Sequence, residues 1–229
     1  MSINFEFLNN SVDPNNQVSF PYYFDGADKK EAKFKLMFIG NSITYHERKD
    51  QIGWYKDCGM AASDINHDYV HIIYREIEKK YGPTSLCVFN GGHWEKDFLN
   101  ESLLDSIVGC TKDFSPDILI IRIGENFNKE YLKDENSVFL AFNSLIKRNK
   151  EHAKKVYITS MFWEHPVLDE AILKASQENN VTYIKIFDLG AQRKYLAYDQ
   201  YNNGAIYCGH PGDLGMEAIA ERILGAMKL

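Results

Sequence analysis

The sequence predicts an α/β fold in which a mainly parallel, five-stranded sheet lies between two layers of helices. Five short apolar segments alternate along the chain with segments whose apolar residues recur at helical spacing. Strands and helices that alternate in this way form parallel sheets, and right-handed crossovers bring the carboxyl ends of the strands to one edge. Three of those ends carry glycine beside short polar side chains. This is typical of a ligand-binding edge.

The expected strands are almost wholly apolar, as strands buried on both faces of a parallel sheet usually are. They cover residues 36–39, 85–89, 117–123, 155–160 and 182–187. The first strand ends at Gly40, and a glycine there lets the chain turn sharply. The second ends in Asn90-Gly91-Gly92 and the third in Gly124-Glu125-Asn126.

The expected helices have apolar residues on one side and polar residues on the other. They cover residues 69–77, 98–108, 137–151, 167–178 and 215–227. The first stops near Gly82-Pro83, a pair that commonly ends helices. The polar segment 46–67 is longer than the usual βα loop of about 2–6 residues. We expect it to cover the ligand-binding edge, as long loops at such edges often do.

Two parts of the chain differ in pattern. Residues 1–33 mix asparagine-rich stretches with aromatic residues and are followed by no Gly/Ser/Pro linker, so we expect an irregular arm packed on the domain. Residues 34–229 carry the strand and helix pattern and form the domain itself.

Composition restricts the classes of function. A net charge of −6 and the lack of a Lys/Arg-rich block argue against a nucleic-acid partner. No basic-then-apolar leader opens the chain and no apolar run approaches the roughly 20 residues of a membrane helix. The four scattered cysteines predict reduced thiols in a cytoplasmic protein, and the histidines lack metal-ligand spacing. We therefore expect no membrane association, no metal and no cofactor; the oligomeric state stays open.

The candidate chemistry lies at the strand ends. Ser42 follows the first strand in Gly40-Asn41-Ser42 and is a candidate nucleophile, although a serine there can also cap the next turn. His210 precedes the last helix and is a candidate general base, although a single histidine is often structural. Backbone N–H groups near Ser42 and a glycine, together with the Asn126 amide, could bind an oxyanion.

In their order along the chain, these motifs resemble the SGNH (GDSL-type) hydrolase family. The resemblance covers about residues 35–229 and implies a flavodoxin-like SGNH hydrolase fold with Ser42, Gly92, Asn126 and His210 as catalytic residues. It also implies a serine esterase that acts through an acyl-enzyme on a small ester, with an O-acetylated carbohydrate as the leading substrate class. The alternatives are an O-acyltransferase on a sugar and a catalytically silent α/β binding domain.

The acid that orients the histidine in this family usually lies three residues before it, where this chain has Tyr207. Asp213 is the nearest acid, but it opens the last helix and is expected to cap it. We therefore expect a Ser42–His210 dyad. A backbone carbonyl, the Tyr207 hydroxyl or an acid such as Glu125 would orient His210.

Several further residues at the strand ends are candidate substrate contacts. They are Asn41, Trp54, Trp94 and Glu125, with Trp163 as a further aromatic. Tryptophan rings can stack on the apolar face of a sugar, but they also pack in cores. For Glu95 and Glu125, the sequence favours neither contact with substrate nor exposure on the surface over the other.

Overall fold

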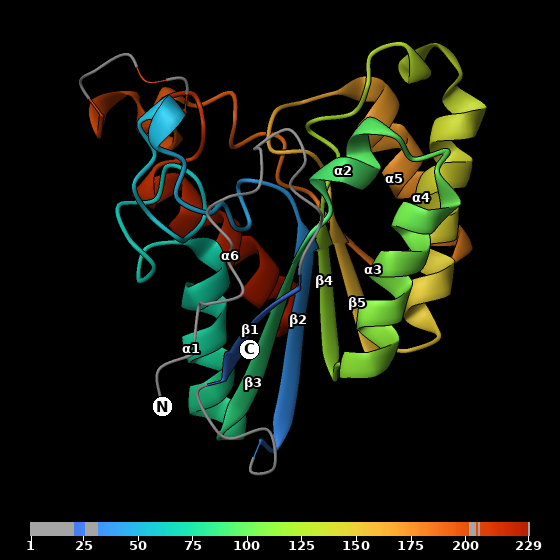
Figure 1. Ribbon diagram of the computed structural model, residues 1–229, viewed down its shortest axis with the longest axis horizontal. Coiled ribbons are helices and arrows are strands. Elements are labelled where there is room, and N and C mark those ends of the chain that lie inside the picture. The colour runs from blue at the N-terminus through green and yellow to red at the C-terminus, as the bar shows by residue number, and fades with distance from the viewer. Residues whose placement is uncertain (1–20, 26–31, 202–204, 206, 229) are drawn as a thin grey trace.

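A six-stranded sheet forms the centre of the described structure (Figure 1). The computed structural model describes residues 21–25, 32–201, 205 and 207–228. The strand order is β1-β3-β2-β4-β5-β6. The strands are β1 (Pro21–Asp25), β2 (Phe34–Gly40), β3 (Thr84–Asn90), β4 (Ile118–Arg122), β5 (Lys155–Thr159) and β6 (Thr182–Ile184). The last five run parallel, which confirms the predicted sheet.

The prediction of an irregular arm is wrong over Pro21–Asp25, because these residues form β1 and pair antiparallel with β3. A run rich in aromatic residues has high strand propensity, and a proline is tolerated at the first residue of an edge strand. The rest of the predicted arm up to residue 31 lies outside the described residues. β6 is shorter than expected, since the Ser160 hydroxyl accepts the N–H groups of Ile186 and Phe187.

Helices cover both faces of the sheet, as predicted (Figure 1). One face carries α1 (Tyr69–Tyr81) and α6 (Asp213–Met227), and the other carries α3 (Glu101–Phe114), α4 (Glu135–Lys150) and α5 (Pro166–Glu178). Short 3₁₀ turns occur at η3 (Asp50–Ile52), η4 (Tyr131–Lys133), η5 (Arg193–Tyr195) and η6 (Ala197–Asp199). The short helix α2 (Gly92–Lys96) was not expected, because five residues cannot show helical periodicity.

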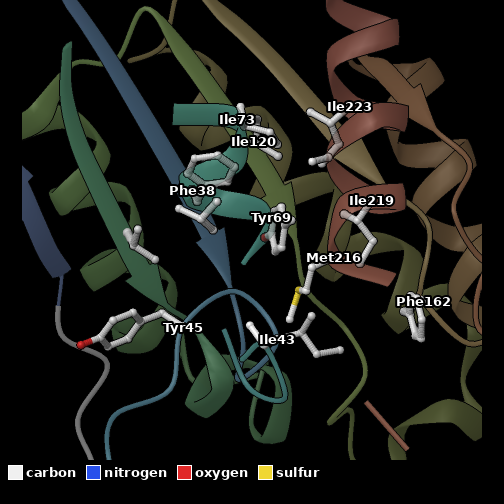
Figure 2. Packing of buried hydrophobic residues seen from close by; sticks show 14 of the residues in the cluster. Phe38, Ile43, Tyr45, Tyr69, Ile73, Ile120, Phe162, Met216, Ile219 and Ile223 are labelled. Carbon is white, nitrogen blue, oxygen red and sulfur yellow. The ribbon is translucent and has the colours of Figure 1, made fainter. Parts of the chain in front are cut away.

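Alternate residues of the buried strands face opposite layers. In β2, Phe38 belongs to the core beneath α1 and α6, whereas Ile39 belongs to the core beneath α3, α4 and α5. Figure 2 shows the first of these cores, with Phe38, Tyr69 of α1 and Ile219 of α6 among its labelled residues. Because β2 pairs with β3 on one side and with β4 on the other, the carboxyl ends of these three strands lie next to one another.

None of the described helices is both long and apolar enough to cross a bilayer. All four cysteines are buried and in the thiol form, and Cys87 Sγ lies 3.8 Å from Cys110 Sγ.

Candidate active site

Ser42 lies in a tight turn directly after β2. Gly40 is required here, because a Cβ atom would approach the Thr44 Oγ1 to 1.8 Å and the Arg122 carbonyl to 2.9 Å. The turn closes through the Asn41 carbonyl, which accepts the Thr44 N–H at 2.9 Å. The Ser42 carbonyl accepts the Met60 N–H at 2.8 Å, which holds the long 46–67 segment against this turn. In the described part of the chain, no residue hydrogen-bonds the hydroxyl or the amide of half-buried Ser42.

Asn41 lies beneath this turn at the centre of a buried polar network. Its Nδ2 donates to Glu95 Oε1 at 2.8 Å and to Glu125 Oε2 at 2.6 Å. Its Oδ1 accepts the Ile43 N–H at 3.2 Å and Arg122 Nη1 at 3.1 Å. With 1% of its surface exposed and both amide atoms engaged, Asn41 supports the turn from below. The prediction that it contacts substrate is wrong.

Glu95 projects from α2 into this network and is fully buried. Its carboxylate accepts from the Gly124 N–H at 2.5 Å and from Asn126 Nδ2 at 2.6 Å, in addition to Asn41. Burial, reinforced by the charge of Glu125, raises the pKa of Glu95 to about 7. The sequence left open whether Glu95 contacts substrate or lies exposed on the surface. Its burial excludes the second of these interpretations.

Glu125 forms a buried ion pair with Arg122, the one charged residue of the apolar strand β4. Its Oε1 also accepts the Phe162 N–H at 3.0 Å, and its Oε2 accepts from Asn41. Both carboxylate oxygens are therefore engaged by the protein, and the side chain is 8% exposed. Glu125 therefore joins the segments that contain Asn41, Arg122 and Phe162. The prediction that it contacts substrate is wrong.

Of the two predicted oxyanion donors, Asn126 has a hydrogen available and Gly92 does not. Asn126 is exposed, and its Nδ2 is placed by Glu95, so one amide hydrogen remains available. The Gly92 N–H donates to Asn90 Oδ1 at 3.0 Å and is already engaged. The chain turns at Gly124, two residues before Asn126. The φ of Gly124 is +142°, which is disfavoured for residues that carry a Cβ.

His210 is positioned at the same edge by the loop before α6. Its ring meets the half-buried Trp163 edge-on, with ring centroids 5.7 Å apart. Burial lowers the pKa of His210 to about 4, while the charge of Glu125 and an interaction with the Tyr207 backbone act in the opposite direction. Glu125, whose charge raises the pKa of His210, also hydrogen-bonds Asn41, the residue before Ser42.

Two side chains near His210 do not take the expected roles. The Tyr207 hydroxyl donates to the Gly53 carbonyl at 3.2 Å, so it is directed to the 46–67 segment. Asp213 does not cap α6, whose N-cap is Gly212 without a side-chain bond. The Asp213 Oδ1 instead accepts the Ser63 N–H at 2.7 Å and joins that segment to the helix. The capping prediction is wrong, because the Asp213 Oδ1 accepts from Ser63 and from Gln200 Nε2, both outside the helix.

The two tryptophans predicted to contact substrate are core residues, each 1% exposed. Trp54 packs edge-on against Tyr207, and its Nε1 donates to the His46 carbonyl at 3.2 Å. Trp94 packs edge-on against Phe127 on the opposite side of the sheet. Neither ring offers a face to a ligand, so these predictions are wrong. Trp163, beside His210, is the aromatic residue that lies at the site.

Sequence reasoning missed the buried network because it did not single out Arg122. A lone arginine in an otherwise apolar strand needs a buried partner, and that is a signal that could have been used. Among the described residues, no cluster of three or more His, Cys, Asp or Glu side chains is arranged to hold a metal ion.

No protein-family model matches the chain, and no curated protein matches its sequence. Solved structures do match in fold. Axe2, an acetylxylan esterase from Geobacillus stearothermophilus, has a TM-score of 0.57 at 18% identity, over 86% of this chain and 95% of that chain. LAE5, an α/β hydrolase enzyme from the metagenome of Lake Arreo, has a TM-score of 0.56 at 18% identity, over 86% and 96%. The psychrotrophic esterase EstA from Pseudoalteromonas sp. has a TM-score of 0.56 at 11% identity, over 86% and 97%.

These similarities show that the chain has the three-layer α/β fold of these enzymes. Two further structures are catalytic mutants of Axe2, in which a serine or a histidine is replaced by alanine.

Proposed function

We propose that the chain is a serine esterase of the SGNH type that removes a small acyl group, in the first place an O-acetyl group, from a carbohydrate. The observation that carries this proposal is the position of Ser42. It follows β2 at the ligand-binding edge, and its hydroxyl and amide have no hydrogen-bond partner among the described residues. The acetyl substrate class rests on the names of the acetylxylan esterases that share the fold.

In the proposed reaction, Ser42 Oγ attacks the ester carbonyl carbon while His210 accepts the hydroxyl proton. The resulting tetrahedral oxyanion is stabilised by the Ser42 N–H and an Asn126 Nδ2–H, since preorganised donors lower the barrier most where charge develops. Collapse breaks the bond to the alcohol, which takes the proton from His210, and leaves an acyl-enzyme. Water then attacks that ester by the same route and releases the acid.

The protonation state of His210 allows it to act as the base. With its pKa lowered to about 4 by burial, the ring is neutral near pH 7 and can accept a proton. The negative charge of Glu125 favours the imidazolium that forms, which is part of what an acid does in a complete triad. We leave Gly92 out of the oxyanion site, because its N–H is bonded to Asn90.

The test is covalent labelling of Ser42 by a fluorophosphonate probe, followed by mass spectrometry, with Ser42→Ala as the control. Hydrolysis is then measured on p-nitrophenyl acetate and on acetylated xylo-oligosaccharides. Labelling at Ser42 with turnover of either substrate supports the proposal. Folded protein that is neither labelled nor active contradicts it.

A catalytically silent binding domain is the second candidate, and one observation favours it. Tyr207 stands where the family has its acid, and its hydroxyl is directed away to Gly53. Under this alternative, Ser42 stays unlabelled, and acetylated sugars bind without being cleaved. Isothermal titration of the same oligosaccharides distinguishes the two candidates.

A further inference from the structure

We propose that Glu95 is a positioning residue for the ester-cleaving reaction. Its carboxylate holds the Asn126 carboxamide so that one amide hydrogen faces the oxyanion. This inference rests on the proposed function and deepens it, because it adds a residue that would control the reaction without touching the substrate.

The contacts of Glu95 divide between its two oxygens. Oε1 accepts two donors, Asn41 Nδ2 at 2.8 Å and the Gly124 N–H at 2.5 Å, and Oε2 accepts Asn126 Nδ2 at 2.6 Å. One fully buried side chain therefore ties together the turn that carries Ser42 and the loop that carries Asn126. Figure 1 shows α2, the helix that supplies Glu95, at this end of the sheet.

An ionised carboxylate can only accept hydrogen bonds, whereas a carboxamide has a donor end and an acceptor end. Asn126 is exposed, and within the described structure its carboxamide is bonded through Nδ2 to Glu95. The carboxylate therefore selects the nitrogen end of Asn126. The second hydrogen on that nitrogen is left for the substrate oxygen.

Glutamine at position 95 would reverse this selection. Two donors already converge on Oε1, so the glutamine oxygen would take that place and its NH₂ would face Asn126. Two donors cannot bond, and the Asn126 carboxamide would turn its oxygen toward Gln and its nitrogen away from the site. We expect Glu95→Gln to lower kcat on p-nitrophenyl acetate by about 10²–10³, as loss of one oxyanion donor does.

Three kinetic outcomes belong to this inference. In Glu95→Gln, KM should change less than threefold. Asn126→Ala should lower kcat by the same factor as Glu95→Gln. The double variant should be no slower than either single variant, since both substitutions remove the same interaction. If Asn126→Ala slows the reaction and folded Glu95→Gln keeps its kcat, the inference is overturned while the proposed function stands. Absence of turnover and of Ser42 labelling in the wild type overturns the proposed function itself.

A paired substitution separates positioning from a structural role. In Glu95→Gln/Asn126→Asp the donor and acceptor are exchanged, so the hydrogen bond returns, but residue 126 has no N–H group. We expect thermal stability to recover and kcat to stay low. Recovery of both would show that Glu95 acts through stability alone and would overturn the inference.

The unmodified protein provides a measurement that does not depend on a variant folding. A proton on Glu95 belongs on Oε2, because Oε1 accepts two donors, and it would face Asn126 as the glutamine NH₂ does. Burial and the charge of Glu125, itself paired with Arg122, raise the pKa of Glu95 to about 7. Protonation of His210 lies lower, at about 4.

Wild-type kcat should therefore fall about tenfold per pH unit below pH 7 and reach a plateau above it. In Glu95→Gln this decrease should be absent between pH 5.5 and pH 8. A wild-type kcat that is constant over this range would overturn the inference.

Discussion

The Asn41→Asp substitution tests the buried network beneath the proposed nucleophile. Asn41 Nδ2 donates to two carboxylates, those of Glu95 at 2.8 Å and Glu125 at 2.6 Å, and an aspartate would replace this donor by a third carboxylate. Hydrogen bonds to charged groups contribute about 1.5–3 kcal/mol each. Loss of both gives about 3–6 kcal/mol of destabilisation at pH 8, a large part of the usual 5–15 kcal/mol.

The loss should depend on pH in a defined direction. Two neighbouring carboxylates and burial would raise the pKa of the new aspartate above its unfolded value of about 3.9. The folded state then binds more protons than the unfolded state, so the free energy of unfolding falls as pH rises through the folded pKa. The defect should be larger at pH 8 than at pH 5.

Urea unfolding followed by tryptophan fluorescence measures the free energy of unfolding at both pH values. Asn128→Asp is the matched control, because Asn128 is exposed and its Oδ1 accepts the Glu130 N–H, a contact that aspartate keeps. The control should change stability by less than about 0.5 kcal/mol. A loss below about 1 kcal/mol in Asn41→Asp at pH 8 would refute the network as described.

Further predictions concern the base, the loop contact of α6 and the aromatic core. His210→Ala should lower kcat/KM by at least about 10³-fold, whereas Asp213→Asn should stay within about threefold, because asparagine keeps the oxygen that accepts the Ser63 N–H. An equal collapse in steady-state kinetics of both variants would make Asp213 the triad acid. Trp94→Ala should cost about 3–5 kcal/mol in urea unfolding, since the ring is 1% exposed. A loss under about 1 kcal/mol would contradict its burial.

The layered sheet could be predicted from the sequence because its signals are local. Each parallel strand is buried on both faces and so must be apolar along its length, and each covering helix shows its buried side as a repeat. The position of Ser42 after a glycine at a strand end followed from the same reasoning. The edge strand Pro21–Asp25 did not, because its pairing with β3 is a long-range contact.

The roles of the aromatic and acidic side chains could not be predicted, because burial depends on which loops meet. Trp54 and Trp94 both follow strands, as a ligand-contacting tryptophan would, yet both are enclosed by side chains distant in sequence. Asp213 has the position of a helix cap but bonds a loop 150 residues away.

By itself, the sequence determined the strands, the covering helices and the edge at which Ser42 would lie, since these follow from periodicity and short-range turn chemistry. Only the tertiary structure decided that Asn41, Glu95, Arg122 and Glu125 form one buried network beneath Ser42. The physical reason is that burying charged groups is favourable only when their partners converge. Here that convergence is produced where the turns that follow β2 and β4 meet Glu95 of α2.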